Sequence, residues 1–95
     1  IHIVFNNGVH GSVGGQPTVG FKINFCQVAD ACGYTYSSCT MTLTALRGAI
    51  DEAKGIKGPS FIEVQTLPDN REEVGRPTSS PEGNKIEFMK YLGVV

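Results

Sequence analysis

The chain has no tryptophan, no excess of charge of either sign, and no long apolar run. Eight Lys and Arg against nine Asp and Glu give a formal net charge of −1, so the basic surface that nucleic acid or an anionic membrane requires is missing. No stretch approaches the roughly 20 apolar residues needed to cross a bilayer, and no signal peptide is visible. We therefore expect neither a nucleic-acid nor a membrane partner.

Cysteine is also scarce, with three residues at positions 26, 32 and 39. An odd number without paired short spacings argues against a disulfide framework and against a zinc site. Cys26 and Cys32 fall on an expected helix, where we predict that they are buried as small apolar residues. Free thiols of this kind are typical of the cytosol, so we expect a cytoplasmic protein.

The segment that opens the chain, Ile1 to Phe5, is typical of a short strand, because it holds β-branched and aromatic residues before a turn signal. The turn that follows is Asn6-Asn7-Gly8-Val9. Ligands of α/β sheets bind at the carboxyl ends of strands, and amide oxygens suit Mg²⁺ beside a phosphate group. The alternative is that Asn-Gly only makes a tight turn.

A glycine-rich loop continues from this turn, with five glycines among residues 8–20 and no charged residue unless His10 is protonated. A flexible linker is one interpretation of such a loop. Three valines and a Gln-Pro-Thr run are unusual in a linker, however. Because glycine lets a backbone approach a ligand closely, the loop is also a plausible bed for a cofactor.

Turn and cap residues divide the rest of the chain into alternating helices and strands. The segments they define are a helix from Asn24 to Gly33, a strand from Tyr34 to Ser38, a helix from Thr40 to Gly55, a strand from Ser60 to Thr66, a polar loop from Pro68 to Ser80 and a helix from Ser80 to Gly93. In the last helix Ile86, Met89 and Leu92 share one face, which we predict is buried.

This alternation predicts an α/β fold with a short parallel sheet of about three strands and three helices in three layers. So narrow a sheet leaves its edges and part of one face uncovered. We therefore expect flanking strands upstream of Ile1, and self-association of the 95-residue chain.

Residues 6–21, Asn-Asn-Gly-Val-His-Gly-Ser-Val-Gly-Gly-Gln-Pro-Thr-Val-Gly-Phe, resemble the phosphonopyruvate decarboxylases, which are thiamine-diphosphate-dependent 2-keto acid decarboxylases. Asn6-Asn7 is similar to the closing half of that family's cofactor motif, and residues 58–64 and 75–78 are similar to its later segments. The resemblance implies a thiamine-diphosphate-binding fold. Residues 1–95 would be the C-terminal part of the diphosphate-binding domain, with the Gly-Asp-Gly half of the motif and the pyrimidine-binding domain upstream.

The resemblance also implies how the turn would bind the cofactor. The Asn7 side chain and the Val9 main-chain carbonyl would be ligands of Mg²⁺, and Asn6 and Gly8 would complete the cofactor-binding turn. Asn6 is expected to hold the turn rather than the metal.

Substrate and catalytic residues are expected around this turn. His10 is the candidate for proton handling, the alternative being a histidine that only hydrogen-bonds the loop. Three neutral residues, Ser12, Gln16 and Thr18, are candidates to line the substrate pocket. Arg76 is the candidate to bind a phosphonate through its guanidinium, the alternative being a solvated arginine in a charged loop.

The implied activity is that of a lyase that decarboxylates 3-phosphonopyruvate to phosphonoacetaldehyde and CO₂, a step in aminoethylphosphonate biosynthesis. Sulfopyruvate or another 2-keto acid remains an alternative substrate, and a non-catalytic interaction module is an alternative of another class. The parent enzyme is expected to be a homo-oligomer with active sites between subunits, and the isolated chain to be inactive.

Overall fold

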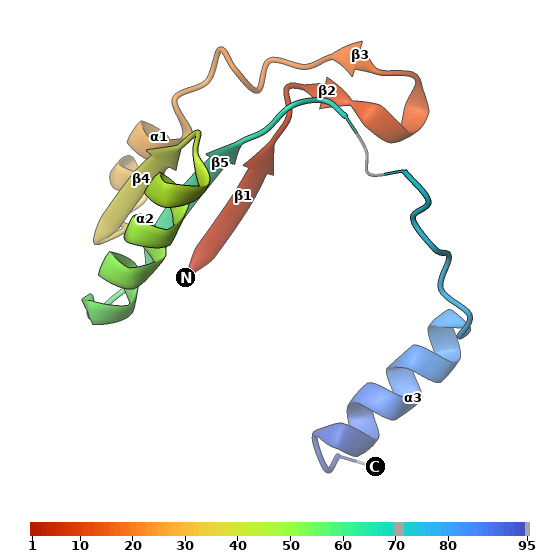
Figure 1. Ribbon diagram of the computed structural model, residues 1–95. Coiled ribbons are helices and arrows are strands. Elements are labelled where there is room, and N and C mark those ends of the chain that lie inside the picture. Colours follow the sequence, from red (N-terminus) through yellow and green to blue (C-terminus); the bar gives the residue numbers. More distant parts are fainter. Residues whose placement is uncertain (70–71, 95) are drawn as a thin grey trace.

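The fold is built from three parallel strands, three α-helices and a small hairpin, described in a computed structural model over residues 1–69 and 72–94 (Figure 1). The elements in chain order are β1 (His2–Asn6), β2 (Val9–His10), the 3₁₀ helix η1 (Gly11–Val13), β3 (Gln16–Pro17), α1 (Phe25–Ala31), β4 (Tyr36–Thr40), α2 (Leu43–Gly55), β5 (Ser60–Gln65) and α3 (Pro81–Tyr91). The α/β class expected from the sequence is confirmed.

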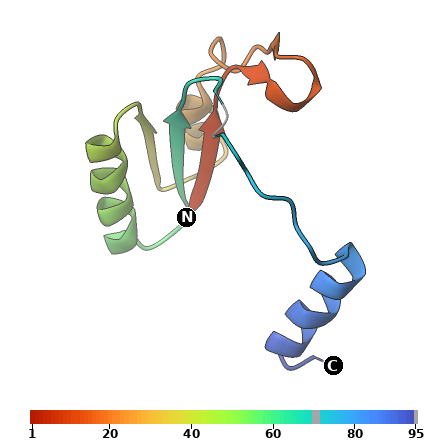
Figure 2. The same cartoon turned by 45° about the vertical axis from the view of Figure 1, so that its right-hand side comes forward.

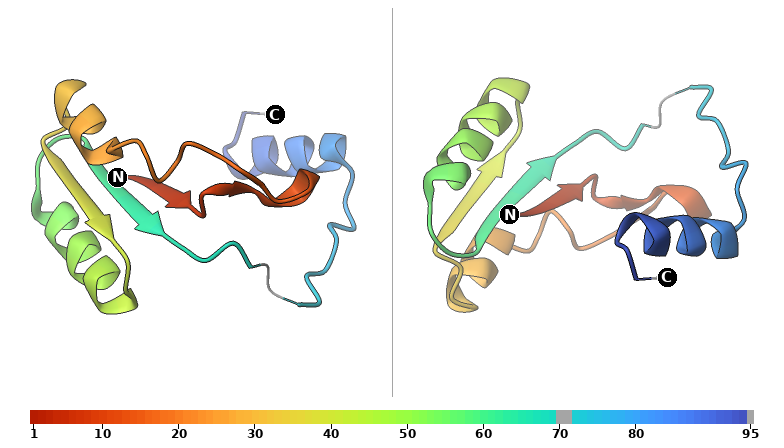
Figure 3. Two further views of the ribbon diagram at one scale, coloured as in Figure 1. Left: turned by 90° about the horizontal axis from the view of Figure 1, so that it is seen from above. Right: turned by 90° about the horizontal axis from the view of Figure 1, so that it is seen from below.

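The main sheet has the strand order β1-β5-β4, with both pairs parallel, so the last strand in the chain lies in the middle. The chain passes from β1 to the far edge at β4 through α1, and returns to β5 through α2. Parallel crossovers are right-handed, and these two run in opposite directions, so their helices must lie on opposite faces of the sheet. Figure 3 shows α1 and α2 on either side of the strands, which confirms the three layers.

The core lies between α2 and the central strand. Ile62 of β5 is completely buried, and it packs with Val64 against Ala49 and Ala53 of α2. Leu46 and Ile50 of α2 and Tyr36 of β4 border this cluster. The face of α2 that carries these residues therefore covers the sheet.

Strand β4 begins two residues later than the sequence suggests, at Tyr36 instead of Tyr34. The Tyr34 amide donates to the Ala29 carbonyl, which completes the turn after α1, and the Thr35 amide donates to the Pro59 carbonyl just before β5. The N-cap of α2 is also displaced. Thr42 accepts a hydrogen bond from the Ala45 amide, whereas the predicted cap, Thr40, lies in the sheet and donates to the Glu63 carbonyl.

Helix α1 begins and ends as predicted, because the Asn24 side chain accepts from the Gln27 amide and Gly33 has a left-handed φ of 85°. Its cysteine positions are not buried as predicted, however. Cys26 is half-buried and Cys32 is exposed. The helix has only seven residues and is buried through Ala29, which leaves its outer positions in solvent.

Helix α3 also begins as predicted, with Ser80 accepting from the Gly83 amide and Pro81 at the start. The prediction of a buried apolar stripe is wrong: Ile86 is 41% exposed, Leu92 is exposed, and no residue of α3 is buried. Figure 2 shows the helix standing apart from the sheet. Accordingly, the radius of gyration is 16.9 Å, against about 12 Å for a compact domain of this length.

Residues 70 and 71 of the expected polar loop lie outside the described residues. Over residues 1–69 and 72–94, no helix combines the length and apolar character needed to cross a membrane.

Two Ile→Ala substitutions compare how much the core and the exposed helix contribute to the free energy of unfolding. Ile62→Ala should lower the free energy of unfolding by about 2–5 kcal/mol, because it opens a cavity at a completely buried position. Ile86→Ala should change it by less than about 0.5 kcal/mol, since that side chain is 41% exposed on α3. Urea unfolding of both variants measures the difference, and equal losses would contradict this account of the core.

Candidate functional site

The carboxyl ends of the three parallel strands meet at one edge of the sheet, where β1 ends at Asn6, β5 at Gln65 and β4 at Thr40. The turn after β1, the hairpin of β2 and β3, and the segment that leads to α1 all lie beyond this edge (Figure 1). This is the position at which α/β sheets bind their ligands.

The Asn6 side chain joins three segments of the chain. Its amide nitrogen donates to Glu63 Oε1 of β5 at 2.7 Å and to the Gly20 carbonyl at 2.9 Å. Its oxygen accepts from the Gly8 amide at 3.1 Å. The residue is only 7% exposed. Asn6 is thus fully engaged within the protein, in agreement with the expectation that it holds the turn.

The next three residues form a tight, ordered turn. Asn7 Oδ1 accepts from the Val9 amide at 3.1 Å, and the Gly8 carbonyl accepts from the Thr18 amide at 2.8 Å. Gly8 has a left-handed φ of 72°, and a Cβ at this position would collide with the Phe21 ring. Glycine is therefore required here for both conformation and space.

The turn carries oxygen donors that suit a magnesium ion. The Asn7 amide oxygen has two lone pairs, and the bond from the Val9 amide uses one. Asn7 is half-buried, unlike the buried Asn6. With the Val9 carbonyl, it makes a set of neutral, hard oxygen ligands of the kind Mg²⁺ binds together with phosphate oxygens. The residues present therefore fit the magnesium ion that the resemblance implies.

The structure brings Thr18 to the turn and leaves the other substrate candidates farther out. The Thr18 hydroxyl accepts from the Gly20 amide at 3.0 Å, so its side chain stabilises the loop that leads from β3 back to α1, here called the return loop. His10 and Gln16 face each other across the β2–β3 hairpin and are both exposed. Ser12, in η1, is exposed as well. The side chains of His10, Ser12 and Gln16 are therefore accessible to a ligand.

Arg76 lies on the exposed segment that leaves the sheet after β5 and leads to α3 (Figure 1). In the part of the chain that the structure describes, its guanidinium makes no hydrogen bond or ion pair with the Asn6–Val9 turn.

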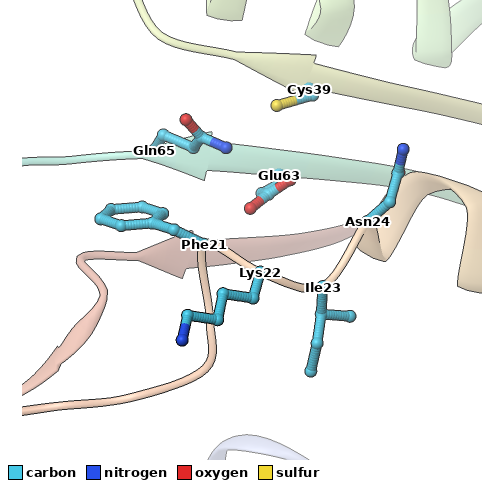
Figure 4. A pocket seen from close by; sticks show the side chains of 7 residues that line it. All are labelled: Phe21, Lys22, Ile23, Asn24, Cys39, Glu63 and Gln65. Atoms are coloured by element: carbon cyan, nitrogen blue, oxygen red, sulfur yellow. The ribbon is translucent and has the colours of Figure 1, made fainter.

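An open cavity of about 270 Å³ lies next to the turn, and the sequence gives little indication of it. Its lining is Phe21, Lys22, Ile23, Asn24, Cys39, Glu63 and Gln65 (Figure 4). Glu63 lies between Cys39 of β4 and the segment from Phe21 to Asn24. The Lys22 side chain extends away from Glu63. The only sequence signal for this cavity is Glu63 itself, a carboxylate within the apolar run Phe-Ile-Glu-Val.

A second cavity, of about 370 Å³, adjoins the first and shares Phe21 and Gln65 with it. It is mainly apolar, with Met41, Thr66, Leu67 and Pro68 completing its wall. The carboxyl edge of the sheet therefore offers a polar and an apolar compartment side by side.

The Cys39 thiol in the first cavity is held in its neutral form. Loss of solvent around the sulfur raises its pKa from 9.0 to about 11, with further contributions from a hydrogen bond to Glu63 and from the negative charge of that carboxylate. Desolvation also raises the pKa of Cys26, helped by the charge of Glu63. Because the thiolate is the reactive form, this raised pKa makes the exposed Cys39 less reactive at neutral pH than an ordinary thiol.

Residues 1–64 match the family model for the thiamine pyrophosphate enzyme, C-terminal TPP binding domain. Thiamine pyrophosphate is another name for thiamine diphosphate. The matched range includes the Asn6–Val9 turn, the return loop and β5 as far as Val64. The chain belongs to this family of thiamine-diphosphate-binding domains.

Among individual proteins, the chain is similar to the phosphonopyruvate decarboxylases of Streptomyces viridochromogenes and Streptomyces hygroscopicus. Both are 35% identical to it, over 92 and 91 residues respectively, which is 97% and 96% of this chain. The aligned part is 23% of each relative, so the chain spans about a quarter of their length. No solved structure matches the chain. The resemblance noted in the sequence is therefore confirmed.

The neutral state of Cys39 can be tested by alkylation. At pH 8, Cys39 should react with iodoacetamide about a hundredfold more slowly than a thiol of pKa 9.0, because its pKa of about 11 leaves far less thiolate. Mass spectrometry of the Cys39 peptide measures the rate, and Glu63→Gln should raise it by removing the neighbouring charge. Labelling of Cys39 at the rate of the reference thiol would show that neither desolvation nor the carboxylate suppresses its ionisation.

Proposed function

We propose that this chain is the metal- and diphosphate-binding part of a thiamine-diphosphate-dependent decarboxylase that converts 3-phosphonopyruvate to phosphonoacetaldehyde and CO₂. The observation that carries this is the ordered turn from Asn6 to Val9, which lies at the carboxyl edge of the sheet within the range that matches the family. The names of the two Streptomyces relatives support the phosphonate substrate.

In this proposal some residues of the turn bind the metal and others hold the backbone. Asn7 and Val9 bind Mg²⁺ through the side-chain amide oxygen and the main-chain carbonyl, while Asn6 and Thr18 hold the backbone in place. Gly8 lets the turn adopt its left-handed conformation beneath Phe21. When bound, thiamine diphosphate supplies the electron sink that decarboxylation of a 2-keto acid needs.

The substrate would lie on the side of the turn where the hairpin is exposed. His10 is proposed to orient the substrate or to accept and return a proton, and Ser12 and Gln16 to hydrogen-bond it. Arg76 is proposed to bind the phosphonate bidentately.

The proposed enzyme is cytoplasmic, serves phosphonate biosynthesis and works as a homo-oligomer with active sites between subunits. Two features support contact with further polypeptide. Strand β1 is an edge strand with no charged residue and no proline to protect it, and α3 exposes Ile86, Phe88 and Tyr91. The same surfaces support self-association of the 95-residue chain when it is isolated.

The metal role of Asn7 predicts a magnesium-dependent defect. In the enzyme that contains this chain, Asn7→Ala should raise the Mg²⁺ concentration needed for half-maximal activity by more than about tenfold, since one of the ligands is lost. Steady-state rates with Mg²⁺ varied at saturating cofactor measure this. The matched control is Asn84→Ala on exposed α3, which should leave the Mg²⁺ requirement unchanged. An Asn7→Ala enzyme with the control's Mg²⁺ requirement would remove Asn7 from the metal site.

The phosphonate role of Arg76 predicts a defect that depends on the substrate. Arg76→Ala should raise KM for 3-phosphonopyruvate by roughly ten- to a hundredfold with a smaller change in kcat, because the contact contributes mainly uniform binding. Kinetics with pyruvate, which lacks the phosphonate, provide the control and should barely change. A parental KM for 3-phosphonopyruvate in this variant would show that Arg76 does not bind the phosphonate and is a solvated surface residue.

A further inference from the structure

Glu63 is a buried carboxylate that the metal and substrate roles described above do not use. It is 3% exposed in the middle strand of the sheet, between the buried residues Ile62 and Val64. The ion pairs of the described residues do not include it, and Lys22, which lines the same cavity, extends away from it. Burial of a carboxylate without a cation is costly unless hydrogen bonds compensate for the lost solvent.

The compensating contacts come from the Cys39 thiol and, at short range, from Asn6. In the sheet register Glu63 lies beside Val4 of β1, and its Oε1 reaches the Asn6 amide nitrogen at 2.7 Å. This distance is typical of the shorter and stronger hydrogen bonds made to a charged acceptor. The contact joins two residues that are 57 positions apart in the chain.

This contact acts together with the Gly8 amide and the Gly20 carbonyl to determine which way the Asn6 amide faces. A carboxylate accepts hydrogen bonds and does not donate them, so the Asn6 nitrogen has to point toward Glu63. The Asn6 oxygen must then point toward the Gly8 amide, from which it accepts at 3.1 Å. The second hydrogen of the nitrogen reaches the Gly20 carbonyl at 2.9 Å. Without the carboxylate, the preference for this orientation over the flipped one would weaken.

We propose that Glu63 is a positioning residue for the cofactor turn. By making the shortest of the three hydrogen bonds that orient the Asn6 amide, it helps to hold the Gly8 amide and to shape the turn that presents the Asn7 oxygen and the Val9 carbonyl. The part of this proposal that concerns metal binding rests on the proposed function. The part that concerns the shape of the turn does not.

The metal part is tested by titrating the enzyme that contains this chain with Mg²⁺ at fixed thiamine diphosphate. Glu63→Leu should raise the Mg²⁺ concentration for half-maximal activity by roughly ten- to a hundredfold, and saturating Mg²⁺ should restore most of kcat. Glu63→Gln should stay within about fivefold of the parent, because a neutral amide oxygen can still accept from Asn6.

The control is Thr40→Val, which removes the buried bond from the Thr40 hydroxyl to the Glu63 carbonyl without touching the carboxylate. It should lower the thermal midpoint but leave the Mg²⁺ requirement unchanged. If Thr40→Val and Glu63→Leu raise that requirement equally, Glu63 stabilises the sheet and does not position the turn.

The shape of the turn is tested without activity, by hydrogen exchange and mass spectrometry of the peptide that contains residues 6–9. Glu63→Leu should speed exchange in this peptide by about tenfold or more, Glu63→Gln by much less, and Thr40→Val not beyond its effect on the rest of the sheet. If Glu63→Leu fails to fold, Glu63→Asp replaces it, since the shorter side chain keeps the charge but draws it away from Asn6. Exchange at the parental rate in Glu63→Asp, or in a folded Glu63→Leu, would overturn the proposal.

The Mg²⁺ titration and the hydrogen-exchange measurement together distinguish a failure of this proposal from a failure of the proposed function. A parent enzyme that shows no response to Mg²⁺ or thiamine diphosphate would refute the proposed function and, with it, the metal part of the present inference. Faster exchange at residues 6–9 in the Glu63 variants would then still establish that Glu63 holds the turn.

Discussion

The hydrogen bonds of the Asn6 side chain are the interaction on which the rest of this site depends. They connect the end of β1 to the middle of β5, to the return loop at Gly20 and to the turn at Gly8. An asparagine has enough donors and acceptors for these three bonds, whereas an apolar residue has none. The buried Asn6 thereby leaves the half-buried Asn7, one position further, as the side chain available to a ligand.

Sheet topology explains why the turn lies where it does. Because β5 returns to the middle of the sheet, its polar residues Glu63 and Gln65 come up beside the end of β1. The crossovers that bring this about also place one helix on each face, so the carboxyl edge stays open. The adjoining polar and apolar cavities follow from that opening, with Phe21 forming a wall of both.

Local chemistry could be predicted from the sequence, and long-range packing could not. The caps at Asn24 and Ser80 use bonds to an amide three residues away, so the cap and the helix start are visible together. The spacing of Ile86 and Leu92 identifies a face of α3 but does not say whether anything covers that face. Local sequence predicts Thr40 as a cap, whereas its hydroxyl bonds the Glu63 carbonyl 23 positions away, a contact that no local pattern indicates.

The candidate site likewise has a part that could be predicted from local sequence and a part that could not. The turn at Asn6 and Asn7 could be predicted because its residues are contiguous, whereas the cavity around Glu63 is lined by residues 21–24, 39, 63 and 65, which only the folded sheet brings together. The most direct test of the account is a crystal structure of the complete enzyme with Mg²⁺ and thiamine diphosphate. The account predicts the Asn7 oxygen and the Val9 carbonyl at about 2.1 Å from the ion, with Asn6 still bonded to Glu63. A metal bound by Asn6, or one bound away from this turn, would contradict it.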